Sequence, residues 1–77
     1  MEPSKKELES WMQWVYKRES IVTKLANGEL ERAKKYEQEG DITRGVLSLR
    51  HSERLEEERK VITGLFYFLK GIHDDLN

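Results

Sequence analysis

Two histidines and two groups of carboxylates are the residues of this chain whose types could do chemistry. His51 and His73 are 22 positions apart, which on one helix is about 33 Å, so they cannot share a metal ion. One carboxylate group follows each histidine: Glu53, Glu56, Glu57 and Glu58 after the first, Asp74 and Asp75 after the second. Acid–base or two-metal catalysis needs carboxylates that converge in a cleft. Helical spacing distributes these over several faces, so we predict solvated side chains and neither a catalytic nor a metal site.

Other catalytic patterns are missing from the sequence. The chain has no cysteine, so a thiolate metal site and a disulfide are both excluded. No serine or threonine lies in a nucleophile elbow, and no glycine-rich loop follows a predicted strand. We therefore expect a protein that is not an enzyme and needs no cofactor.

The elements that position these residues are helices. The chain has one proline, Pro3, and no stretch with the alternation of a half-buried strand. Ser4 followed by Glu7 fits a capping box at a helix start. Asn27-Gly28 interrupts the apolar periodicity, and glycine disfavours a helix interior, so we expect a break or kink there. Gly40-Asp41 provides a helix stop and the cap of the next helix.

These signals predict an all-α fold with helices at about 4–26, 29–39 and 42–73. A final helix of ~31 residues is roughly 46 Å long, whereas a compact globule of this size is only about 30 Å across. We therefore expect an antiparallel hairpin with a kinked first arm, formed by residues 1–77 as a single small helical domain. Folding at 40–41 would bring Trp11, Trp14 and Val15 near residues 65–70.

The strongest indication of function is the change from charged to apolar residues in the last helix. Residues 50–60 are almost wholly charged, and residues 61–69 are almost wholly apolar. The apolar side chains cover an arc of roughly 160°, wider than one opposing helix needs. The uncovered part predicts either the core of a homodimeric bundle or a surface that binds a larger protein. The candidate partner-binding residues are Trp14, Leu65, Phe66, Phe68 and Leu69, with Phe66 expected to contact the partner and Phe68 to be covered.

Nucleic-acid binding is the alternative. Its candidate residues are Lys34, Lys35, Arg44, Arg50 and Arg54. Charged residues make up 38% of the chain, but the net charge is only −1. A chain that binds phosphate would usually show a clear basic excess, so this function is the less favoured one.

The sequence therefore predicts a small regulatory protein that acts by protein–protein interaction, as an adaptor, co-chaperone or inhibitor of a larger protein. A homodimer is expected, because a chain of 77 residues without disulfides has a marginal core. No apolar run approaches the ~20 residues that span a bilayer, and the N-terminus has no signal-like apolar segment. We expect a cytoplasmic protein without membrane contact.

Overall fold

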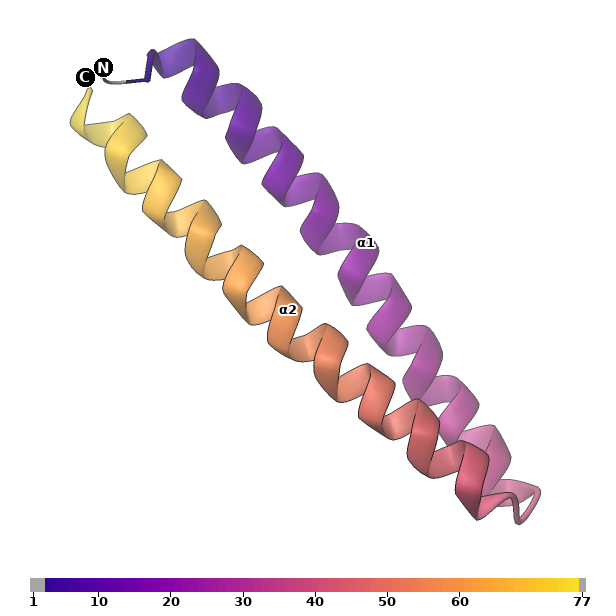
Figure 1. Cartoon of the computed structure of the whole chain (residues 1–77). Helices are drawn as coiled ribbons and strands as arrows, with labels where there is room; N and C mark the ends of the chain where they lie inside the picture. Colours follow the sequence, from indigo (N-terminus) through magenta and orange to yellow (C-terminus); the bar gives the residue numbers. More distant parts are fainter. Residues whose placement is uncertain (1–2, 77) are drawn as a thin grey trace.

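Two long helices joined by a short turn form the molecule, as the computed structural model shows for residues 3–76 (Figure 1). α1 extends over Lys5–Gln38 and α2 over Ile42–Asp75. The helices run antiparallel and side by side, so the start of α1 and the end of α2 lie at the same end of the molecule (Figure 1). The all-α helical hairpin predicted from the sequence is confirmed.

The hairpin is rod-shaped. Its extents are 56 × 16 × 14 Å and its radius of gyration is 17.2 Å. A compact chain of this length would have a radius of gyration of about 11–12 Å. The shape follows from helix length, because two helices of 34 residues are each about 51 Å long and can bury apolar surface only against one another.

Local capping fixes both ends of the turn. The Gly40 N–H donates to the Glu37 carbonyl at 3.1 Å, and the Asp41 N–H donates to the Tyr36 carbonyl at 2.8 Å. These bonds form a Schellman motif, which requires the left-handed conformation that Gly40 adopts at φ +78°. The Asp41 carboxylate then accepts from the Arg44 N–H at 3.2 Å and caps α2. The predicted hairpin turn therefore forms at the expected residues.

Of the break or kink predicted at Asn27-Gly28, the break is wrong. α1 continues through both residues, so a separate helix over 29–39 does not exist. Ala26, Glu29 and Ala33 are all buried against α2, and they maintain the contact on both sides of Gly28. Packing along this whole face outweighs the preference of one glycine, which is only about 1 kcal/mol.

The two glycines should respond oppositely to alanine. Gly40→Ala is expected to lower the free energy of unfolding by about 1 kcal/mol, because φ +78° is strained for an L side chain. Gly28→Ala is expected to raise it by up to about 1 kcal/mol, since a Cβ at Gly28 meets no atom within 4 Å and alanine is the better helix former. Urea denaturation of both variants measures the difference. A loss of stability in Gly28→Ala would show that α1 is bent or strained at this residue.

The interface between the helices has a heptad-like period. Residues facing the other helix recur in alternating steps of three and four, the spacing of a coiled-coil seam. All of them are buried or half-buried. On α1 they are Leu8, Met12, Val15, Glu19, Val22, Ala26, Glu29, Ala33 and Tyr36; on α2 they are Gly45, Ser48, Ser52, Leu55, Arg59, Ile62, Phe66, Leu69 and His73.

The two halves of this interface differ in side-chain size. Large apolar residues form the core from the termini to the middle, where Leu8, Val15 and Leu69 form one cluster and Val22, Ala26 and Leu55 form the next. In the half near the turn, by contrast, α2 faces α1 with its small residues, the buried Gly45, Ser48 and Ser52. The Ser52 hydroxyl donates to the Ala26 carbonyl at 3.4 Å. Small side chains therefore allow the helices to approach closely near the turn, but they bury little apolar surface.

Candidate docking grooves on the two flanks of the hairpin

The seam divides the surface of the hairpin into two flanks, each formed by both helices. The seam is the line along which the facing residues of α1 and α2 meet. Each flank is therefore formed by the side chains of both helices that lie on one side of this line. Each flank carries an apolar groove. One is near the termini and is lined with aromatic residues, and the other is near the turn and is lined with aliphatic residues.

The aromatic groove lies between the first half of α1 and the second half of α2. It is lined by Trp11, Trp14, Val15, Leu65 and Leu69. Val15 and Leu69 are buried and form its floor, while Trp14 is 68% exposed on its wall. The juxtaposition of Trp11, Trp14 and Val15 with residues 65–70, predicted from the fold at the turn, is confirmed. Three of the five candidate partner-binding residues therefore lie in one groove.

Within this chain the burial of the two phenylalanines is the reverse of the one expected from the sequence. Phe66 is the covered ring: it packs against the cluster of Leu8, Val15 and Leu69, and its centroid is 6.5 Å from that of Tyr16. Phe68, which was expected to be covered, is 65% exposed. At 100° per residue Phe68 lies on the same flank as Leu65, beside the aromatic groove, whereas Phe66 points across the seam. The exposed ring beside the aromatic groove is therefore that of Phe68, whereas the Phe66 ring contributes to the packing between the helices.

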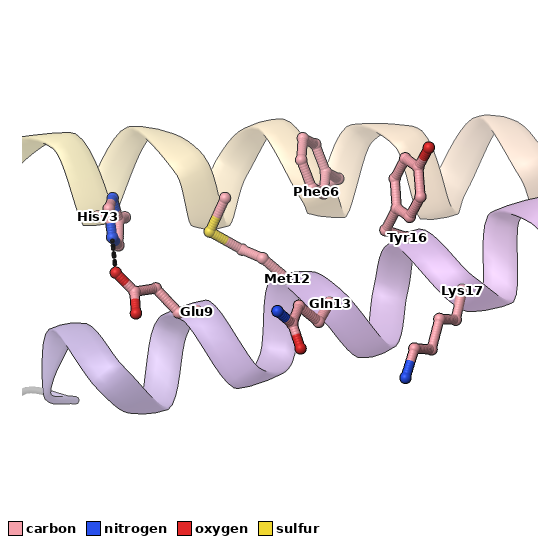
Figure 2. A pocket seen from close by; sticks show the side chains of 7 residues that line it. All are labelled: Glu9, Met12, Gln13, Tyr16, Lys17, Phe66 and His73. Carbon is pink, nitrogen blue, oxygen red and sulfur yellow. Dashed lines mark hydrogen bonds and ion pairs between the residues drawn. The ribbon is translucent and has the colours of Figure 1, made fainter.

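Phe66 instead closes a pocket on the opposite flank. Figure 2 shows this pocket, with Met12 and Tyr16 of α1 next to Phe66 of α2. At its outer end His73 Nε2 is 3.0 Å from Glu9 Oε1 (Figure 2). His73 is thus held in the last turn of α2 by a contact with α1. His73 Nδ1 is in turn 3.6 Å from Asp74 Oδ1, so the imidazole lies between a carboxylate of α1 and one of α2.

The charged run over residues 50–60 contributes both to the seam and to the surface. Ser52 and Leu55 are buried in the interface, so the run is not solvated on every face. Glu58 reaches across to α1, where its Oε1 is 2.9 Å from Arg18 Nη2. His51 Nδ1 lies 3.6 Å from Glu29 Oε2, and Glu29 is also paired with Arg32. Among residues 3–76, no three histidine, aspartate or glutamate side chains converge as a metal site.

The five candidate phosphate-binding residues do not share one face. Lys34 lines the aliphatic groove. Helical spacing places Lys35 and Arg54 on the other flank, and Arg50 on the back of α2. Arg44 Nε is 3.5 Å from the Asp41 carboxylate, and its guanidinium carbon is 6.0 Å from the centroid of the Tyr36 ring. The structure therefore distributes these cations around the rod.

The aliphatic groove was not recognised in the sequence as a site. Its apolar wall consists of Leu30 on α1 and of Ile42, Val46 and Leu49 on α2, and its floor is Ala33 and Gly45. Ile42 is 76% exposed. The spacing of Gly45, Ser48 and Ser52 was the sequence signal that could have revealed this groove. When small residues face the other helix, the neighbouring branched residues lie outside the interface and are exposed.

The helices of the described chain, residues 3–76, contain no segment that combines the length and the apolar character needed to cross a membrane. Comparison of the chain with family models, with curated proteins and with solved structures finds no match.

Proposed function

We propose that this protein is a non-enzymatic interaction module that docks a segment of a larger protein in its aromatic groove. Trp14, Leu65 and Phe68 are the anchors, and Leu69 is part of the floor. The observation that carries the proposal is the exposure of two tryptophans and a phenylalanine along one flank. Tryptophan is the residue most enriched among those that dominate binding energies, and contiguous exposed apolar surface marks interaction sites.

An amphipathic helix is the partner segment that this groove fits best. The groove lies between two antiparallel helices, so a third helix can lie along it and complete a three-helix packing. Apolar residues of such a segment at i, i+3, i+4 and i+7 would contact both walls. The ion pair of Arg18 and Glu58 crosses the same interface further toward the turn and limits the apolar part of the groove on that side. The proposed role is that of an adaptor, co-chaperone or inhibitor.

Binding is expected to depend on the anchors and not on salt. Trp14→Ala combined with Phe68→Ala should weaken partner binding by 2 kcal/mol or more, about 30-fold, because both side chains would lose their contacts with the partner. Tyr67→Ala is the matched control, since Tyr67 is also an exposed aromatic residue of α2 but points away from the groove. Pull-down from the native host identifies the partner, and titration with that partner gives the affinities.

The chain has two tryptophans and both line the groove, so occupation of the groove should shift the tryptophan emission to shorter wavelength. Unchanged emission on binding, or equal affinities of the double variant and the Tyr67→Ala control, would contradict the proposal. Recovery of nucleic acid that is lost steeply between low and moderate salt would instead support the nucleic-acid alternative.

A further inference from the structure

The aliphatic groove cannot be covered by any described part of this chain. Its wall residues Leu30, Ile42, Val46 and Leu49 are all exposed, whereas the residues that face α1 at the same level of α2 are Gly45 and Ser48. In the half of the hairpin near the turn, the branched residues thus lie outside the interface between α1 and α2, and the small residues lie inside it. In a two-helix protein that functions alone, burial would favour the reverse arrangement.

The accessible surface of the chain exceeds that of a compact monomer by enough to accommodate an interface. The accessible area is 6219 Å², whereas a compact folded monomer of 9.2 kDa would expose about 4,900 Å². The excess of about 1,300 Å² is more than the ~800 Å² that each partner contributes to a standard interface. One flank of the rod can supply such an area. The net charge of −1 produces little repulsion between two copies.

We infer that a second copy of this chain covers the aliphatic groove, with the two-fold axis parallel to the long axis of the rod. α1 of each copy then lies over α2 of the other, and all neighbouring helices are antiparallel, as in a four-helix bundle. The turns of both copies lie at the same end. This inference goes beyond the proposed docking function and does not rest on it.

The internal contacts of one hairpin fix which residues meet in the dimer. Ser52 is level with Ala26, and Gly45 is level with Ala33, where a Cβ at Gly45 would be 3.7 Å from the Ala33 carbonyl oxygen. Leu30 is therefore level with residues 48–49. Under the two-fold axis Leu30 of one copy lies over Leu49 of the other, and Val46 of one copy lies over the small floor at Ala33 of the other.

This arrangement leaves the aromatic grooves free. They lie on the flank opposite to the aliphatic groove, so they face outward on the two sides of the dimer. The same dimer would therefore present two docking sites. Loss of dimerisation and loss of partner docking can be tested separately, because different side chains of α2 carry them.

Sedimentation equilibrium of two matched variants tests the inference. The wild type should have twice the 9.2 kDa subunit mass at about 100 µM. Val46→Lys with Leu49→Lys should raise the dimer dissociation constant at least about 100-fold, because four lysines, two from each copy, would be placed in the contact. Val61→Lys with Phe68→Lys is the control: it also replaces two exposed side chains of α2, but on the opposite flank, and should remain dimeric.

Circular dichroism verifies that both variants retain the helical content of the wild type. A wild type of one subunit mass at this concentration would overturn the inference. So would dissociation of the control variant while the groove variant stays dimeric, because the copies would then meet through the aromatic flank.

The absence of cysteine permits a second, positive test. Leu30→Cys and Leu49→Cys are made separately, mixed and oxidised, and a disulfide between the two variants is expected to form rapidly. Mixing Leu30→Cys with Val61→Cys is the control, and it should give little of the mixed product, since Val61 lies on the other flank. Equal yields from both mixtures would contradict the proposed arrangement.

Discussion

Val22→Asp is expected to unfold the hairpin at room temperature. The Val22 side chain is completely buried, and its cluster contains Ala26, Leu55 and the half-buried Ile62. A carboxylate placed there would be charged without a partner or would have to bind a proton, and either costs several kcal/mol. A chain of 77 residues has a total stability of only about 4–12 kcal/mol. Loss of the helical circular dichroism signal measures the effect.

Ile21→Asp is the matched control for this experiment. It introduces the same carboxylate one residue earlier on α1, but Ile21 is half-exposed on the aromatic flank, so the charge stays in water. We expect the free energy of unfolding to change by less than about 1 kcal/mol. Equal losses in both variants would indicate that α1 is rotated relative to the packing described above.

Phe66→Ala should lower the free energy of unfolding by about 2–3 kcal/mol. A fully buried phenylalanine loses about 3–5 kcal/mol on truncation, and the value is reduced here because Phe66 is only half-buried. Its ring packs against the cluster of Leu8, Val15 and Leu69 and lines the pocket next to Met12 and Tyr16, so its removal loses these contacts and widens the pocket. Thermal and urea denaturation measure the loss.

Phe68→Ala should change stability by less than about 0.5 kcal/mol, since an exposed surface side chain contributes little to folding. It should instead weaken binding in the aromatic groove. This pair of outcomes reverses the roles that the sequence suggested for the two rings. If Phe68→Ala were the more destabilising substitution, Phe68 would have to be buried in an interface between copies, and the aromatic flank would be the dimer contact.

The sequence by itself determined the all-helical class, the helix ends marked by capping residues, and the turn. Ser4, Gly40 and Asp41 act through hydrogen bonds to backbone groups no more than five residues away, so their effects can be read from local sequence. The hairpin topology follows from helix length, because helices of about 50 Å can only pack lengthwise. The meeting of Trp11 and Trp14 with Leu65 and Leu69 follows from the position of the turn.

The continuity of α1 was decided by tertiary structure. Asn27-Gly28 has local preferences that favour a break, and the apolar residues Leu25 and Leu30 are out of register across it. The buried residues, however, are Ala26, Glu29 and Ala33, two of them small and one charged. A pattern of large apolar residues does not reveal this face. It becomes an interface only because α2 presents small residues opposite to it.

The rotation of α2 about its own axis was also decided by tertiary structure, and it determines the sites. The apolar arc near the end of α2 is wide enough to accept α1 at more than one angle, so the sequence alone did not specify which phenylalanine would be covered. Near the turn, Gly45, Ser48 and Ser52 fit closely against Ala26 and Ala33. Because α2 is one continuous helix, its orientation about its axis near the turn also sets which side chains face α1 at its other end. The close fit near the turn therefore directs Phe66 inward and exposes Phe68. It also places Val46 and Leu49 on the outer surface.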